Sequence, residues 1–157
     1  MLFTLGYEGL DINTYIAALK LHDIQTLVDV RELPLSRKKG FSKNVLATRL
    51  DLEGIGYVHL RSLGAPRPIR HALRADGDWP EYCRGYFGHL EQQEDELVAL
   101  GTLAQHTTIC LLCFEAEPSE CHRSLITDRL EARGLVPRAH HLTPQTVKAE
   151  PEVAALV

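Results

Sequence analysis

The 157-residue sequence lacks any apolar segment long enough to cross a bilayer. Its longest unbroken apolar run is the six residues 109–114, whereas a spanning helix needs ~20. The N-terminus, Met1-Leu2-Phe3-Thr4, also lacks the basic stretch that opens a secretory leader. These absences predict a cytoplasmic protein that makes no contact with a membrane.

Several motifs of well-known enzyme classes are also missing. Gly6-Tyr-Glu-Gly9 lacks the spacing of a dinucleotide fingerprint, and the chain has no P-loop, no G-x-S-x-G elbow and no H-E-x-x-H. This excludes nicotinamide redox chemistry and ATP hydrolysis, so no cofactor is expected. The four cysteines match neither a disulfide scaffold nor a paired C-x-x-C zinc site, which predicts reduced thiols at Cys83, Cys110, Cys113 and Cys121.

What is present fits one globular domain. Apolar residues make up 45% and charged residues 24%, close to the averages of soluble proteins. Short apolar runs predict strands at residues 2–6, 26–30, 57–60, 108–114 and 138–142. Helical periodicity and capping residues predict helices from 11 to about 22, from 42 to 54, from 78 to 101 and from 118 to 134.

Strand alternating with helix is typical of an α/β fold, here a single-domain three-layer sandwich with a mainly parallel sheet of about five strands. We assign residues 1–142 to this domain and 143–157 to a C-terminal tail. The tail could dock on its own chain or form the contact of a homodimer, and both alternatives stay open.

Charge is unevenly distributed along the chain. The net charge is −4, but residues 31–74 contain ten basic and three acidic residues, a local charge of +7. One surface is therefore expected to bind an anionic small molecule or nucleic acid. The alternative is a set of solvated side chains balanced by acidic residues elsewhere.

Polar residues follow the predicted strands, where parallel sheets bind their ligands. The strand ends carry Tyr7, Glu8, Asp29, Arg31, Glu32, His59, Arg61, Cys113, Glu115 and His141. The basic segments 38–42 and 61–78 leave the same edge and are interpreted as binding loops or a lid.

The densest group of reactive side chains lies in residues 111–124. A thiol at a strand end or helix N-terminus is shifted toward the thiolate, which makes Cys113 or Cys121 a candidate nucleophile. Arg123 could bind an anion, His122 or His141 could serve as a base, and Glu115 could orient either or accept a proton. The structural alternatives are buried thiols, histidines at His59 and His141 that satisfy backbone carbonyls, and an Asp29–Arg31 pair that fixes a loop.

Six ordered motifs resemble the DUF488 family of bacterial and archaeal proteins over residues 2–142. They are Thr4-Leu-Gly-Tyr-Glu8, Asp29-Val-Arg31, Pro34-x-Ser-Arg37 with Phe41, His59…Leu63-Gly64, Leu112-Cys-x-Glu115 and Pro118-x-x-Cys-His-Arg123. The resemblance implies a signature set of Tyr7, Glu8, Asp29, Arg31, Ser36, Arg37, His59, Cys113, Glu115, Cys121, His122 and Arg123, and it implies no established reaction.

A second resemblance is to rhodanese-type sulfurtransferases. Val28-Asp-Val-Arg-Glu32 is similar to their aspartate–arginine turn, and Cys113 with Arg123-Ser124 is similar to their active-site half. A rhodanese or phosphatase loop places its arginine about five or six residues after the cysteine so that its amides surround one anion. Here the first arginine follows Cys113 by ten residues, so the spacing does not predict such a loop.

The leading hypothesis is an enzyme with an anionic substrate, in which Arg31, Arg37 and Arg123 bind charge. Glu8 and Glu115 would carry out acid–base steps, and Cys113 or Cys121 would be the nucleophile or a redox thiol. One alternative is a nucleic-acid-binding module without chemistry. Another is a metal site built from Cys113, Cys121, His122 and either His59 or His141, although adjacent helical residues point about 100° apart.

Overall fold

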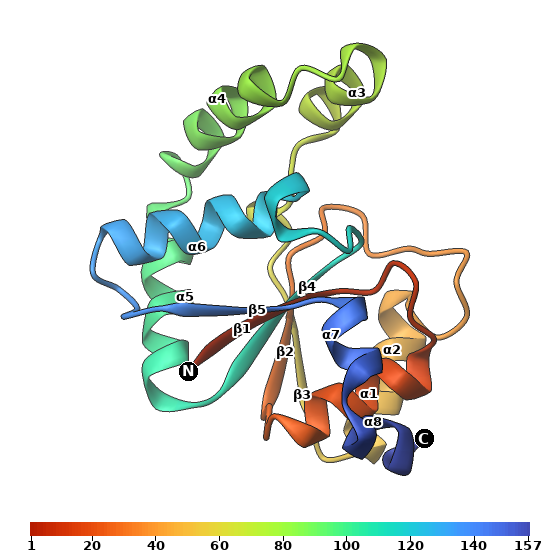
Figure 1. Ribbon diagram of the computed structural model, residues 1–157. Helices are drawn as coiled ribbons and strands as arrows, with labels where there is room; N and C mark the ends of the chain where they lie inside the picture. Colours follow the sequence, from red (N-terminus) through yellow and green to blue (C-terminus); the bar gives the residue numbers. More distant parts are fainter.

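The computed structural model describes residues 1–157 and contains one five-stranded parallel sheet (Figure 1). The spatial order is β3-β2-β4-β1-β5, and every neighbouring pair runs parallel. The strands are β1 (Leu2–Gly6), β2 (Thr26–Asp29), β3 (Gly56–His59), β4 (Ile109–Cys113) and β5 (Ala139–Leu142). This confirms the predicted α/β class and all five predicted strands, with ends that shift by one residue at most.

Helices cover both faces of the sheet, as a three-layer sandwich requires (Figure 1). One face carries α1 (Ile12–Leu21), α2 (Lys43–Leu52), α7 (Pro144–Ala149) and α8 (Pro151–Leu156), and the other carries α5 (Glu94–His106) and α6 (His122–Ala132). Successive strand residues point to opposite faces, so Leu27 lies in one core cluster and Val28 in the other. The three inner strands, β1, β2 and β4, are therefore buried on both sides.

The helical region predicted from 78 to 101 is not one continuous helix but parts of two. Asp78 does begin a helix, since its carboxylate accepts a hydrogen bond from the Glu81 N–H. However, α4 (Trp79–Leu90) ends before the turn at Glu91, and α5 starts at Glu94 with Gly101 in its interior. The run of polar residues at 91–96 interrupts the apolar periodicity and allows the chain to turn from one helix into the next.

The segment 61–78, interpreted as a loop, is largely helical. It forms a short 3₁₀ turn, η1 (Arg61–Leu63), and then α3 (Arg67–Asp76), which ends at Gly77 with φ of 67°. Ile69 and Leu73, one turn apart, pack against the second core cluster, while none of the helix is fully buried. Together α3 and α4 extend away from the sheet (Figure 1). The two prolines and four arginines of segment 61–78 obscure this apolar pair in the sequence.

The last fifteen residues dock on their own chain. They form α7 and α8, and α8 packs against α1. Val147 and Val153 are buried in the same core cluster as α1, and Thr143 closes a capping box at the start of α7. No helix of the protein combines the length and the apolarity that crossing a membrane would require.

Candidate functional site

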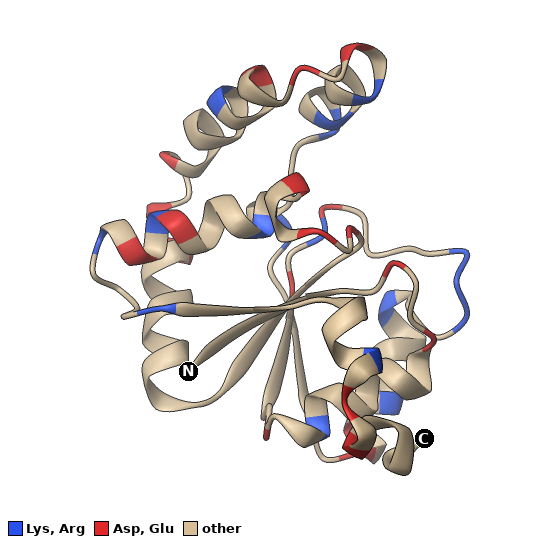
Figure 2. Ribbon diagram, in the orientation of Figure 1, with Lys and Arg blue, Asp and Glu red and all other residues tan.

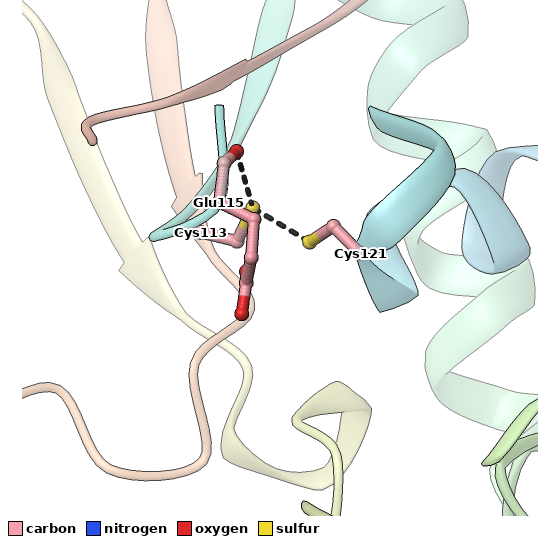
Figure 3. A group of neighbouring side chains, drawn as sticks. All are labelled: Cys113, Glu115 and Cys121. Atoms are coloured by element: carbon pink, nitrogen blue, oxygen red, sulfur yellow. Dashed lines mark hydrogen bonds between the residues drawn. The ribbon is translucent and has the colours of Figure 1, made fainter. Parts of the chain in front are cut away.

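The site is centred on Cys113, the last residue of β4, which pairs in register with Gly6 of β1. The Cys113 sulfur lies 2.7 Å from Nη1 of Arg123 and 2.7 Å from the sulfur of Cys121. Figure 3 shows the Cys121 side chain reaching toward Cys113 from the start of α6. The backbone oxygen of Glu115 is also 3.9 Å from the Cys113 sulfur, so the arginine is its much closer polar neighbour.

Arg123 is fully buried, and no carboxylate lies within 4.0 Å of its guanidinium. Nε donates to Oγ1 of Thr4 at 3.1 Å, Nη2 donates to the Ala116 carbonyl at 3.0 Å, and Nη1 donates to the Glu115 carbonyl. Burial acts to lower the pKa of Arg123, but the Cys113 and Cys121 sulfurs outweigh it and raise the pKa above its ordinary value. The cation is thus retained in the interior.

Cys121 is the N-cap of α6. Its sulfur accepts a hydrogen bond from the Arg123 N–H at 3.4 Å, and its S–H is directed to the Cys113 sulfur. Burial, together with the bond to Cys113, raises the pKa of Cys121 well above its usual range. Cys121 therefore remains a protonated thiol beside Cys113.

His122 is also buried, and its hydrogen bonds define its tautomer. Nε2 lies 2.7 Å from the Val30 carbonyl, which can only accept, so Nε2 carries the proton. Burial lowers the pKa of His122, so the ring is neutral at pH 7 and Nδ1 has a free lone pair. That Nδ1 lies 3.7 Å from the Cys121 sulfur.

The loop after β4 approaches β1 so closely that residue 6 must be glycine. A Cβ on Gly6 would lie 1.8 Å from the Glu115 carbonyl oxygen and 2.9 Å from Nη1 of Arg123. The same loop is fixed from the other side by Glu8, whose carboxylate accepts a hydrogen bond from the Ala116 N–H at 3.0 Å. Gly6 and Glu8 therefore position the carbonyls that hold Arg123.

A second arginine is held beside the cluster at the end of β2. Nε and Nη2 of Arg31 donate to the two carboxylate oxygens of Asp29, at 2.9 and 2.7 Å. The Tyr57 hydroxyl donates a hydrogen bond to the same Asp29 carboxylate. This paired geometry keeps the Arg31 cation in a buried position. The remaining nitrogen, Nη1, lies 3.4 Å from the Tyr7 hydroxyl.

A cavity of about 420 Å³ opens onto Cys113. Its polar lining contains Arg31, Arg70, Arg74, Glu32, Glu115 and Glu120. Arg31 is paired with Asp29 and Arg70 with Glu32, whereas Arg74 forms no ion pair within 4.0 Å. Glu115 and Glu120 likewise form no ion pair, so the lining is of mixed charge, with Arg74 as its free cation and two free carboxylates.

The thirteen candidate residues are the twelve of the signature set and His141. Eight of them gather at this cavity. Tyr7, Arg31, Cys113, Glu115 and His122 line it, and Asp29, Cys121 and Arg123 lie directly behind the lining. The other five do not line it: Glu8, Ser36, Arg37, His59 and His141. The Nε2 of His59 lies 2.8 Å from the Arg31 carbonyl, the Ser36 hydroxyl accepts from the Lys38 N–H, and the Nδ1 of His141 is 2.7 Å from the Thr4 hydroxyl.

Sequence reasoning singled out neither Thr4 nor Tyr82, and it included Arg70 and Arg74 only as part of the basic segment 61–78, interpreted as a binding loop or lid. Thr4 contacts Arg123, and Arg70, Arg74 and Tyr82 supply walls of the cavity from α3 and α4. Thr4 stands in the first of the six motifs and could have been included from it. The charge of the segment marked Arg70 and Arg74, whereas the position of Tyr82 depends on the packing of α4 against α3, so no local signal marks it.

The ten basic residues of 31–74 do not form one basic surface. Lys and Arg segments are spread over several helices and loops (Figure 2). Arg31, Arg49 and Arg70 form ion pairs, and the Lys38 ammonium donates to the Tyr7 and Leu10 carbonyls. The partners of Arg49 and Arg70 are Glu53 and Glu32, which the local +7 already includes, so only the Arg31–Asp29 pair neutralises part of that charge.

Three potential metal ligands, Cys113, Glu115 and Cys121, lie within 4.8 Å of one another (Figure 3). His59 and His141, the predicted fourth ligands, are engaged elsewhere. The Arg123 guanidinium, 2.7 Å from the Cys113 sulfur, places a positive charge where a divalent cation would have to bind. The three ligands therefore fit a metal poorly.

Residues 11–130 of the chain match the model of a family described as a domain of unknown function, DUF488. No curated protein and no solved structure matches the chain.

Proposed function

Because the chain belongs to the DUF488 family, whose description names no reaction, we propose its function from the geometry of the site. The protein is a thiol-dependent enzyme that acts on a small anionic substrate, with Cys113 as the nucleophile. The cavity holds the substrate, and the residues behind its lining keep Cys113 reactive.

The observation that carries this proposal is the buried Arg123 without a carboxylate partner. A buried cation is strongly unfavourable unless an anion lies beside it. The nearest group that can become an anion is the Cys113 sulfur, at 2.7 Å, and the S–H of Cys121 donates to the same sulfur. Both neighbours stabilise a thiolate, which is the nucleophilic form of cysteine.

The preference for an anion is inferred from the lining of the cavity. Arg74 has no acidic partner, and Nη1 of Arg31 has only the distant Tyr7 hydroxyl. Either group can therefore pair with a carboxylate, phosphate or sulfonate of a substrate without first breaking an ion pair. Glu115, whose carboxylate lies within 4.8 Å of both sulfurs, is placed to exchange a proton with the reacting molecule.

The first test is alkylation of each cysteine with iodoacetamide over a range of pH, followed by peptide mass spectrometry. Cys83 is a built-in control, because it is half-buried and burial raises its pKa. Its alkylation rate should fall about tenfold for each pH unit below ~8.5. Alkylation of Cys113 should depend much less on pH than that of Cys83, because the Arg123 guanidinium beside its sulfur favours the thiolate. Parallel pH profiles for the two thiols would overturn the proposal.

The anion preference is tested with iodoacetate, which carries the charge that iodoacetamide lacks. We expect Arg74→Ala to lower the ratio of the iodoacetate rate to the iodoacetamide rate at Cys113 by about two- to fivefold. This is the effect of one exposed charge worth less than about 1 kcal/mol. Arg67→Ala is the matched control, since Arg67 lies on the same helix but does not line the cavity. Equal ratios in both variants would refute an anionic substrate.

A further inference from the structure

The two cysteines of the site are adjacent but not equivalent. Their sulfurs are 2.7 Å apart, although the residues are separated by eight positions and belong to β4 and the start of α6. Both side chains are about 1% exposed, yet only Cys113 lines the cavity. A molecule in the cavity can therefore reach Cys113, whereas Cys121 lies behind the lining.

We infer that Cys113 and Cys121 form a dithiol–disulfide couple in which Cys121 resolves a mixed disulfide on Cys113, so the substrate class of this site is a small anionic disulfide. The inference rests on the proposed function, because it requires Cys113 to be the reacting thiol. It adds a role for Cys121 and His122 that a simple nucleophile would not need.

In the first step the Cys113 thiolate attacks one sulfur of the substrate R–S–S–R. The substrate S–S bond breaks, RS⁻ leaves, and Cys113–S–S–R forms. Arg123 stabilises the attacking thiolate at 2.7 Å, and Cys121 does not compete because it is protonated and lies behind Cys113.

In the second step the Cys121 sulfur attacks the Cys113 sulfur and expels the second RS⁻. Once Cys113 is no longer an anion, the Cys121 S–H loses that acceptor, and its nearest remaining base is Nδ1 of His122 at 3.7 Å. His122 takes the proton as the Cys113–Cys121 bond forms. The substrate is then reduced by two electrons to two thiolates, and the protein dithiol is oxidised to a disulfide. A small thiol reductant restores the dithiol by the same exchange in reverse.

Little movement is needed to form the bond. The sulfurs must approach by about 0.7 Å to reach the ~2.05 Å of a disulfide. Cys121 is the N-cap of α6 and not an interior residue, so a shift of its side chain affects only the hydrogen bonds at the start of that helix, from Arg123 and Ser124.

The test uses the full chain carrying Cys83→Ala, because Cys83 would otherwise react as well, while Cys110 is fully buried. The probe is dithiobis(nitrobenzoate), an anionic aromatic disulfide that releases coloured thionitrobenzoate. We expect two equivalents to be released per chain, no adduct on the protein, and a peptide linking Cys113 to Cys121. Adding Cys121→Ser should give one equivalent and a stable adduct on Cys113. Serine is a favoured N-cap, so this variant keeps the start of α6.

The outcomes separate the two proposals. A stable adduct on Cys113 in the Cys83→Ala protein, with no linked peptide, would overturn the couple and leave Cys113 as the nucleophile. No release from Cys113 would overturn both. His122→Asn should slow the second release relative to the first by about tenfold or more, since only the second step uses this histidine as a base. An unaltered second release would remove His122 from the reaction.

Discussion

The pairing of Arg123 with a Cys113 thiolate can be measured as a coupling free energy. The perturbations are Arg123→Gln, Cys113→Ser and the double variant. Arg123→Gln removes the cation and leaves at least one of its three oxygen acceptors, on Thr4, Glu115 and Ala116, without a donor. Each unsatisfied buried acceptor costs about 1–3 kcal/mol, and loss of the bond to a charged sulfur adds about 2 kcal/mol. We expect Arg123→Gln to lower the free energy of unfolding by about 3–5 kcal/mol.

The double variant separates the contribution of the Cys113 sulfur to the free energy of unfolding from that of the three oxygen acceptors. Serine at residue 113 is similar in shape but neutral at pH 7, so the contacts of Arg123 with the three oxygens remain while the anion is gone. The cost of Arg123→Gln should then fall by about 1.5–3 kcal/mol, the strength of a hydrogen bond to a charged partner. Urea denaturation of the four proteins gives this coupling directly. A coupling below about 0.5 kcal/mol would show that Cys113 is a neutral thiol and refute the charge argument.

Two further predictions concern the same region. Gly6→Ala should destabilise the fold by about 3 kcal/mol or more and abolish the weak pH dependence of Cys113 alkylation, because the new Cβ would lie 1.8 Å from the Glu115 oxygen. The control is Gly88→Ala in α4, where an added Cβ would have no atom within 4 Å. In urea denaturation this variant should be neutral or more stable by up to about 1 kcal/mol. Equal effects of the two substitutions would contradict the close approach at Gly6. Stability should also depend on His122, whose pKa is lowered by burial. The unfolded chain binds a proton there that the folded chain does not, so the free energy of unfolding should fall as pH drops below ~6.5, by at most ~1.4 kcal/mol per unit. His122→Asn should make the pH profile shallower between about pH 6.5 and 5, and identical slopes would exclude this contribution.

The fold was predictable because its strands are short, apolar and bounded by clear helix signals. The side chain of Asp11 accepts a hydrogen bond from the Thr14 N–H, as expected of an N-cap, and the helix after it ends at His22. The helix α3 was not predictable, because only Ile69 and Leu73 of its ten residues contact the core region. With two apolar contacts among arginines and prolines, the period that indicates a helix is too weak to read.

The candidate site was predictable in outline from the rule that parallel strands deliver ligands to their carboxyl ends. That rule selected Cys113, Arg31 and Tyr7 correctly as cavity residues. It also selected His141, which lies within the edge strand β5 and reaches only as far as the Thr4 hydroxyl. Strand ends share an edge of the sheet, but only the order of the strands decides which ends lie beside one another.

That order explains why the reactive thiol lies where it does. β1 and β4 are neighbours, but the chain leaves β1 for α1 on one face of the sheet and leaves β4 for α6 on the other. Two connections that diverge from adjacent strands open a crevice between them, and Cys113 is the end of one of those strands. Thr4 and Arg123, 119 residues apart, meet only because of this arrangement. No local motif contains both, so the positive charge beside Cys113 is a property of the topology and could not be inferred from the spacing of the cysteines alone.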